Sequence, residues 1–357
     1  MKLFSVLLVL LIPLTSIAQR LDARRTPALN SAAANARVWA ALNKDFAYIP
    51  GYQKRITYKR SGRHFEKERI ELVSNKEIYI DEKWKKKLKT KFYVHLSNHA
   101  KKLPLVIFLP PVLGITPADH LLGKYLPKNS VHTILFDFGE NLVDSKNEPK
   151  DINDGLRRGV IRFRYLLDYI QHELRDRVDL NNIGIYGMSM GAVAGGFVMG
   201  IFKHYISYGM LVVGGGNMPE IMTYSEQGLI KKLRRGMKIR EGRRRGHNLS
   251  DVEFTNYLRK NLIYDPLYFA DAALVDRIFF IEGGNDTGVP YKNQVEMRNA
   301  FGSNALRLLF KKGGHFPTVY KTLTNPDQIV SFFKYAFKNG TTRGFKHSLA
   351  GTEGFSD

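Results

Sequence analysis

A serine between two glycines is the residue of this chain best placed to act as a nucleophile. Residues 187–191 read Gly-Met-Ser-Met-Gly, with Ser189 at the centre. The short apolar run 183–186 precedes them, and the run of small residues 192–199 follows. A strand, a tight turn and a helix in this order hold a serine hydroxyl exposed at the end of the strand, and the glycines prevent collisions within the turn. We therefore predict that Ser189 is a catalytic nucleophile.

A serine hydroxyl attacks a carbonyl carbon efficiently only when a base removes its proton and an acid orients that base. The chain offers both partners downstream of Ser189, in the order aspartate and then histidine. Asp286 follows the apolar run 278–281, and His315 follows the run 306–310. These positions predict His315 as the general base and Asp286 as the group that orients it.

Other interpretations of these two residues remain open from the sequence. The stretch Asn-Asp-Thr-Gly around Asp286 also suits a loop turn in which the carboxylate accepts backbone hydrogen bonds. His315 could be an ordinary surface histidine in a glycine-rich loop. Three other acidic residues compete with Asp286 for the orienting role: Glu282, which comes early, Asp265, which is expected to be structural, and Asp276.

The tetrahedral intermediate of acyl transfer needs two backbone N–H groups directed at its oxyanion. Met190 follows Ser189 at the start of the expected helix, where the helix dipole favours negative charge. The second donor should come from the loop after the apolar run 105–109, but the prolines at 110–111 have no N–H. Val112 is therefore the predicted second oxyanion donor, with its neighbour Leu113 as the alternative.

The elements that must position these residues can be predicted from hydrophobic patterning. Alternating segments indicate antiparallel edge strands with polar outer faces, at 69–73, 77–80 and 91–96. Continuous apolar runs separated by helical spacers then indicate buried parallel strands, at 105–109, 132–136, 183–186, 206–213, 278–281 and 306–310. Together they predict an α/β protein in which antiparallel strands lead into a mostly parallel, doubly wound sheet.

The spacer between the runs 206–213 and 278–281 is too long for a simple crossover. We predict that residues 217–264 form a helical cap over the site. One helix of this cap is expected to carry an apolar face of Leu229, Ile230, Leu233 and Met237, weakened by Gly228 and Gly236. The same segment is densely basic, with Lys231, Lys232, Arg234, Arg235, Lys238, Arg240, Arg243, Arg244 and Arg245.

From about residue 105 to 338 the chain resembles the α/β-hydrolase superfamily, and within it the serine esterases and lipase-like members. The resemblance rests on Gly-x-Ser-x-Gly at 187–191, Asp-x-x-Val-Pro at 286–290 and Gly-His at 314–315. It implies a serine nucleophile, a histidine base and an orienting aspartate at the three positions already proposed. Many members have His-Gly where this chain has Pro-Pro at 110–111, so the resemblance implies an oxyanion loop of different shape.

Composition limits the remaining possibilities. The chain has 357 residues, a formal net charge of +22 and no cysteine, which rules out disulfides and attachment of a lipid to cysteine. The start reads as a secretory signal peptide, with one lysine, a short apolar run and small residues at 16 and 18. The predicted divisions are a signal peptide at 1–18, an N-terminal extension at 19–53, the hydrolase domain at 54–345 with the cap inserted, and a tail at 346–357.

These observations predict an exported, periplasmic or secreted serine hydrolase that cleaves carboxylic esters, without a cofactor or metal. A peptidase or acyltransferase on the same triad, or a non-catalytic binding protein on this scaffold, remain alternatives. The expected partner is a small-molecule or lipid ester. The basic cap could also contact an anionic membrane surface. Export and the lack of aromatic residues interleaved in the basic run argue against nucleic acid.

Overall fold

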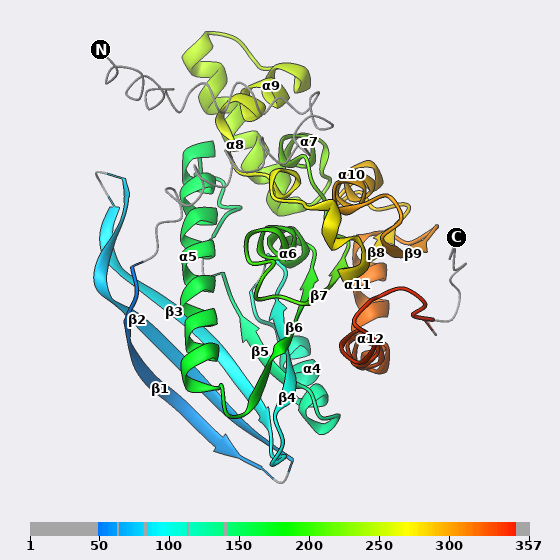
Figure 1. The fold of residues 1–357 in the computed structure, drawn as a ribbon. Helices are drawn as coiled ribbons and strands as arrows, with labels where there is room; N and C mark the ends of the chain where they lie inside the picture. Colours follow the sequence, from blue (N-terminus) through cyan, green and yellow to red (C-terminus); the bar gives the residue numbers. More distant parts are fainter. Residues whose placement is uncertain (1–48, 63, 82–83, 113, 139–140, 348–357) are drawn as a thin grey trace, which may run out of the picture.

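The structure, a computed structural model, describes residues 49–62, 64–81, 84–112, 114–138 and 141–347. The predicted signal peptide, most of the N-terminal extension, Leu113 and nearly all of the predicted tail lie outside the described residues. The described part is one sheet with helices on both faces and further helices beyond one of its ends (Figure 1).

Nine strands make up this sheet. They are β1 Tyr52–Ser61, β2 Phe65–Asp81, β3 Trp84–Ser97, β4 Leu103–Leu109, β5 His132–Phe136, β6 Val178–Met188, β7 Tyr208–Val212, β8 Ile278–Gly283 and β9 Leu306–Phe310. Their order across the sheet is β1-β2-β3-β5-β4-β6-β7-β8-β9. The candidate residues therefore follow β4, β6, β8 and β9, which lie in the same half of the sheet.

The type of strand pairing changes once across the sheet. β1, β2, β3 and β5 pair antiparallel in that order. From β5 onward, through β4, β6, β7, β8 and β9, every pairing is parallel. Nearly every residue of β1 is exposed, as expected for an edge strand. The predicted mostly parallel sheet with antiparallel N-terminal strands is confirmed.

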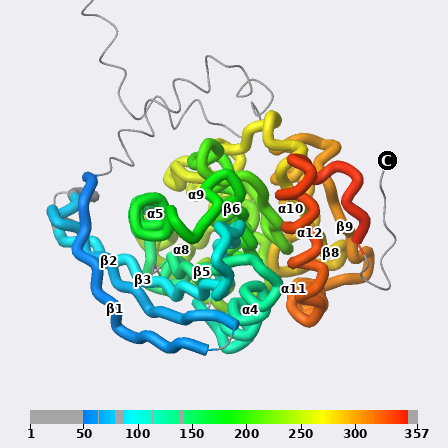
Figure 2. Tube along the Cα trace, turned by 60° about the horizontal axis from the view of Figure 1, so that its bottom comes forward, coloured from blue at the N-terminus to red at the C-terminus, as the bar shows by residue number. Residues whose placement is uncertain are grey.

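Helices cover both faces of the sheet (Figure 2). They are α4 Pro117–Lys128, α5 Pro149–Glu173, α6 Met190–Ile201, α10 Tyr291–Phe301, α11 His315–Leu323 and α12 Pro326–Asn339. The strands send alternate side chains to two cores, so Ile107 and Ile185 lie in one, and Val106 and Tyr186 in the other. The first core lies under α5, α6 and α10, and the second under α4, α11 and α12.

The long segment between β7 and β8 is helical. It contains α7 Met218–Tyr224, α8 Gly228–Arg245 and α9 Asp251–Asn261, followed by two short 3₁₀ helices, Pro266–Tyr268 and Ala272–Arg277. We call α7, α8 and α9 the insertion helices. They lie beyond one end of the sheet, near the start of α5 (Figure 1). None of the described helices is long and apolar enough to cross a bilayer.

Helix α8 differs in part from the predicted amphipathic pattern. Leu233 and Met237 are buried, but Leu229, in the first turn, is 39% exposed. The helix also continues through Gly236. A β-carbon at this position would lie only 2.3 Å from the carbonyl oxygen of Ser145. Gly236 thus allows close contact between α8 and a neighbouring loop, which outweighs its low helix propensity.

Candidate active site

Ser189 occupies a strained turn between β6 and α6. Its backbone has φ 54° and ψ −118°, a conformation that residues with a side chain rarely adopt. The turn is held at the sheet because the Ser189 N–H donates to the carbonyl oxygen of Val212, at 2.9 Å. The Ser189 carbonyl in turn accepts from the N–H groups of Ala192 and Val193 in the first turn of α6. This is the geometry that exposes a nucleophile at the end of a strand.

The two flanking glycines are required by close backbone contacts. A β-carbon at Gly187 would lie 2.4 Å from the carbonyl oxygen of Gly191, on the far side of the turn. A β-carbon at Gly191 would lie 1.9 Å from the carbonyl oxygen of Leu109, at the end of β4. The Gly-x-Ser-x-Gly spacing therefore lets the turn close on itself and lets α6 pack against the exit of β4.

Asp286 and His315 lie in two loops that are joined to each other. The Asp286 loop follows β8, and His315 is the first residue of α11, shortly after β9. The N–H of Asn285 donates to the carbonyl oxygen of Gly313, at 2.9 Å, and the N–H of Gly284 donates to that of Phe310, at 3.0 Å. These hydrogen bonds set the distance between the carboxylate and the imidazole.

The three predicted side chains meet in two consecutive hydrogen bonds. The Ser189 Oγ lies 2.8 Å from His315 Nε2, and His315 Nδ1 lies 2.8 Å from Asp286 Oδ2. The Asp286 side chain is 0% exposed and that of His315 is 7% exposed. When Nδ1 carries the ring proton and donates to Asp286, Nε2 can accept the serine hydroxyl proton. The arrangement can thus transfer a proton away from Ser189 Oγ.

Two backbone donors and one side chain fix the carboxylate of Asp286. Its Oδ1 accepts from the N–H groups of Gly288, at 2.7 Å, and Val289, at 2.9 Å. Its Oδ2 accepts from Gln294 Nε2, at 3.1 Å, as well as from His315. The local turn and the contact with histidine are therefore compatible: the turn holds one oxygen, which leaves the other directed at the imidazole.

The three competing acidic residues have other partners. Asp265 accepts from the N–H groups of Asn217 and Met218 at the start of α7, and burial raises its pKa. Glu282 forms a buried ion pair with Arg298. Burial raises the pKa of Glu282, as it does that of Asp265. Asp276 pairs with an arginine, Arg343, near the end of the described chain. Each of these acids thus serves a local structural contact.

The two predicted oxyanion donors lie on the same small cavity. Val112 and Met190 both line a space of about 40 Å³ between the exit of β4 and the start of α6. Among the described residues, neither of their backbone N–H groups donates to a protein acceptor. Leu113, the alternative to Val112, lies outside the described residues. Two N–H groups on one cavity beside Ser189 suit the stabilisation of an oxyanion.

Gln294 is a residue of this site that the sequence did not reveal. Its amide, on α10, donates to Asp286 Oδ2 and to the carbonyl oxygen of Val289, and it accepts from the N–H of Gly283 at 3.0 Å. The side chain thus links the end of β8, the orienting carboxylate and the loop after it. No local pattern distinguishes this glutamine from others in an ordinary helix, so only the fold reveals its position.

We expect Gln294→Ala to lower kcat by roughly 10- to 100-fold with little change in KM, because a loosened Asp286 would orient the imidazole less well. The variant also leaves the buried Gly283 N–H without its acceptor, which costs about 1–3 kcal/mol of unfolding free energy. Asn293→Ala is the matched control, because Asn293 Nδ2 donates to the carbonyl oxygen of Gly216 and does not contact Asp286. Equal kcat values for the two variants would rule out a positioning role for Gln294.

The start of α8 lies against the Asp286 loop. The N–H of Glu226 donates to the carbonyl oxygen of Thr287, at 2.7 Å. A β-carbon at Gly288 would lie 2.7 Å from Gln227 Nε2 and 2.9 Å from His315 Cγ. Gly288 therefore leaves the space in which the start of α8 and the imidazole approach each other.

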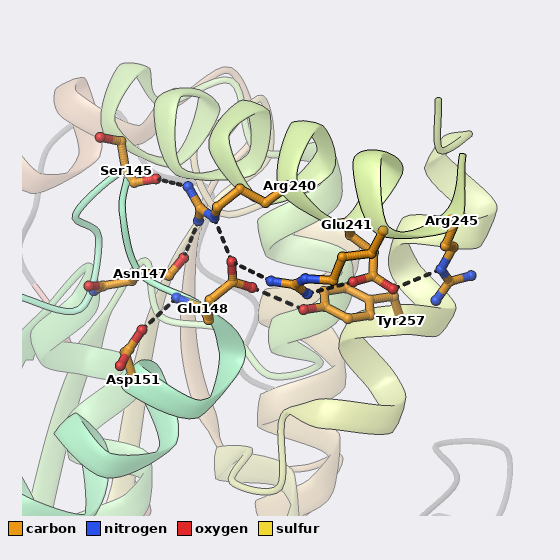
Figure 3. A network of polar contacts seen from close by, with 9 residues as sticks. Ser145, Asn147, Glu148, Asp151, Arg240, Glu241, Arg245 and Tyr257 are labelled. Atoms are coloured by element: carbon orange, nitrogen blue, oxygen red, sulfur yellow. Dashed lines mark hydrogen bonds and ion pairs between the residues drawn. The ribbon is translucent and has the colours of Figure 1, made fainter. Parts of the chain in front are cut away.

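An ion-pair network fastens the insertion helices to the start of α5 (Figure 3). Glu148, directly before α5, accepts from Arg240 Nε at 2.5 Å and Arg244 Nη2 at 3.0 Å, both on α8. Its other oxygen accepts from the hydroxyl of Tyr257 on α9, at 3.1 Å. Arg240 also donates to two backbone carbonyls of the loop before α5. Part of the basic charge of α8 thus serves internal contacts.

Comparisons with known proteins give a structural likeness. A scan against protein-family models finds no match, and a sequence search of curated proteins finds none either. An acetyl xylan esterase from a Paenibacillus species superposes with a TM-score of 0.58 at 11% identity, covering 88% of this chain and 99% of that one. A glucuronoyl esterase from Teredinibacter turnerae gives 0.52 at 14% identity and covers 86% of each chain.

An acetyl xylan esterase from a Thermoanaerobacterium species also gives a TM-score of 0.52, at 10% identity, over 79% of this chain and 88% of that one. These similar structures are α/β-hydrolases. Together with the observed strand order, they establish that this chain has the α/β-hydrolase fold, as the sequence predicted. At such low identities the likeness concerns the fold, and the chemistry must be argued from the residues.

Proposed function

We propose that this protein is a serine hydrolase that cleaves carboxylic esters through an acyl-enzyme. One observation carries the proposal: Ser189 Oγ, His315 and Asp286 form two successive 2.8 Å hydrogen bonds at the ends of three strands. A nucleophile, a base and an orienting acid in this geometry are the parts that acyl transfer requires. None of the steps below calls for a cofactor or metal.

In the first half-reaction His315 Nε2 takes the hydroxyl proton as Ser189 Oγ bonds to the ester carbonyl carbon. The carbonyl oxygen becomes an oxyanion, which accepts from the N–H groups of Met190 and Val112. The charged imidazolium is stabilised by Asp286 through Nδ1–H. The bond from carbon to the alcohol oxygen then breaks, the imidazolium gives its proton to that oxygen, and the alcohol leaves an acylated Ser189.

In the second half-reaction a water molecule replaces the alcohol. His315 Nε2 takes one water proton while the water oxygen bonds to the acyl carbon, and the same two N–H groups hold the new oxyanion. The bond to Ser189 Oγ breaks, and the imidazolium returns its proton to that oxygen. The products are the carboxylic acid and the free enzyme.

The choice of an ester as substrate is supported by the structural neighbours. The three structural neighbours described above are named as esterases, two of them as acetyl xylan esterases. The catalytic residues themselves would serve esters and amides alike. We therefore propose an ester substrate, with peptidase and acyltransferase activity as the alternatives on the same triad.

A fluorophosphonate probe tests the proposal directly. An activated serine is expected to be labelled at Ser189 within minutes, and p-nitrophenyl esters should be hydrolysed. A non-catalytic binding protein on this scaffold would show neither reaction. Labelling at another serine, or no labelling of a folded protein, would contradict the proposed function.

Export and the division of the chain are proposed from the sequence. Residues 1–18 have the composition of a signal peptide, and cleavage after Ala18 would place Gln19 at the mature N-terminus. N-terminal sequencing of protein from the native host is expected to find Gln19. An intact Met1 in that material would contradict export by this route. The proposed cap is the segment 217–264, which holds the insertion helices.

Contact with an anionic membrane surface through the basic cap also stays a proposal. The apolar side of α8 faces the protein, since Leu233 and Met237 are buried, so lipid would meet the opposite side. That side exposes Lys232, Arg235 and Arg243. Co-sedimentation with anionic vesicles that declines at high salt is expected. Equal binding to neutral vesicles would contradict the proposal.

A further inference from the structure

A small cavity adjoins the proposed oxyanion donors, and the proposed function uses only the two N–H groups on its wall. It has a volume of about 40 Å³. Val112 and Met190 line one part of it, and the rest is lined by residues 109–111, Asp137, Phe138, Leu142, Leu156, Gly191 and Ala194. Leu142 and Leu156 belong to the buried cluster under α5 and the insertion helices. Apart from Asp137 the side chains on its wall are apolar, and Met190, the residue after Ser189, lies on it.

The topology of the sheet indicates which part of a substrate would enter this cavity. Ser189 follows β6, whereas Asp286 and His315 follow β8 and β9, on one side of it in the sheet order. The cavity lies on the other side, at the ends of β4 and β5. The leaving alcohol must lie near His315 to receive its proton. The acyl substituent of the same tetrahedral carbon is thereby directed away from His315, toward the cavity.

The walls of the cavity are held in place. Leu156 is 2% exposed and Leu142 is 6% exposed, so both are held by the surrounding core except on the side that faces the cavity. The ring of Phe138 lies against the backbone of α5, where a β-carbon at Gly159 would fall 2.0 Å from its Cδ1. Enlarging the cavity would therefore require several packed side chains to move at once, which close-packed interiors resist.

From these observations we propose that the cavity is the acyl subsite and that it selects short acyl groups, acetyl above all. At 40 Å³ the cavity is far smaller than the roughly 300–1,000 Å³ of pockets that bury drug-sized ligands. That space suits a methyl or ethyl substituent next to the carbonyl. The chain of a hexanoyl or octanoyl ester does not fit. This inference rests on the proposed function and adds the class of acyl group.

Chain-length dependence tests the inference on the wild-type protein. We expect kcat/KM for p-nitrophenyl acetate to exceed that for the hexanoate by at least about tenfold, since one excluded methylene already discriminates by roughly 10- to 200-fold. Equal or higher kcat/KM for hexanoate or octanoate would overturn the acyl subsite, although the hydrolase proposal would stand. If no ester were hydrolysed and the fluorophosphonate did not react, the proposed function itself would fail.

Substitution of the cavity wall gives a second, independent test. Leu156→Ala removes three carbon atoms from the wall and is expected to shift the hexanoate-to-acetate ratio of kcat/KM upward by about tenfold or more. Leu174→Ala is the control: Leu174 is also buried, at the C-terminal end of α5, but it does not line this cavity. The control should lose stability without changing the ratio.

Leu156→Val keeps the inference testable if the alanine variant does not fold, as thermal unfolding will show. The valine variant removes only one carbon atom and is expected to move the ratio in the same direction by a smaller factor. An unchanged ratio in the folded Leu156 variants, or the same shift in Leu174→Ala, would overturn the assignment of this cavity.

Discussion

Ser189→Ala is expected to lower kcat/KM for p-nitrophenyl acetate by about 10⁴-fold or more and to abolish fluorophosphonate labelling. The reason is that the hydroxyl oxygen is the atom that becomes acylated in the proposed mechanism. Loss of a catalytic serine is comparable to loss of the whole triad, because the three residues act as a unit. What remains should come from the oxyanion donors and substrate binding alone.

The fold of this variant should be nearly unchanged. The backbone at residue 189 keeps its hydrogen bond to the Val212 carbonyl, and alanine is as strained at φ 54° as serine is. Loss of the hydroxyl contact with His315 is worth about 1 kcal/mol of unfolding free energy. Ser207→Ala is the matched control, because its hydroxyl donates to the carbonyl oxygen of Asn181, away from the site. Substantial turnover by folded Ser189→Ala would end the triad assignment.

The fold could be predicted well from the sequence because the buried strands are continuous apolar runs. The continuous apolar runs at 105–109, 132–136 and 278–281 lie within β4, β5 and β8. Strands buried on both faces leave little freedom for other patterns. The helical spacers between the runs predicted that these strands are parallel. Parallel strands have their carboxyl ends at the same edge of the sheet.

The candidate site was predictable for a related reason. Ser189, Asp286 and His315 each come directly after a strand, so the order of elements along the chain was enough to bring them together. Their neighbours were not predictable in this way. Gln294 reaches Asp286 from the first turn of α10, and Glu148 reaches α8 from a loop far away in the sequence. Such contacts depend on how helices rotate and pack, which residue order alone does not encode.

The limits of helix patterning are visible in α8. Its residues suggested an apolar face that includes Leu229, but burial in the structure reaches only Leu233 and Met237 fully. The sequence showed a densely basic segment, and in the structure two of its residues, Arg240 and Arg244, share Glu148. Pairing with an acid outside the helix cannot be inferred from the charge of the helix itself.

Asp286→Asn is expected to reduce kcat by about 10⁴-fold while KM changes little. The substitution preserves shape but replaces one carboxylate oxygen with an NH₂ group. The N–H groups of Gly288 and Val289 require an oxygen as acceptor, so the amide oxygen should stay with them. The NH₂ group then faces His315 Nδ1, which must become an acceptor. The ring proton is thereby moved to Nε2, and His315 can no longer take the proton of Ser189.

The opposite orientation of the amide would not rescue the variant. It would direct the NH₂ group at the two buried backbone N–H donors of Gly288 and Val289, with the cost of unsatisfied donors. Asp271→Asn is the matched control: Asp271 also accepts from a backbone N–H two residues on, that of Ala273, and from a cationic side chain, Lys203. It should retain near wild-type kcat.

If Asp286→Asn kept kcat within tenfold while Glu282→Gln lost it, the orienting acid would be Glu282. Because both aspartates hold a turn but only Asp286 contacts an imidazole, the comparison separates the catalytic contribution of the carboxylate from its structural one.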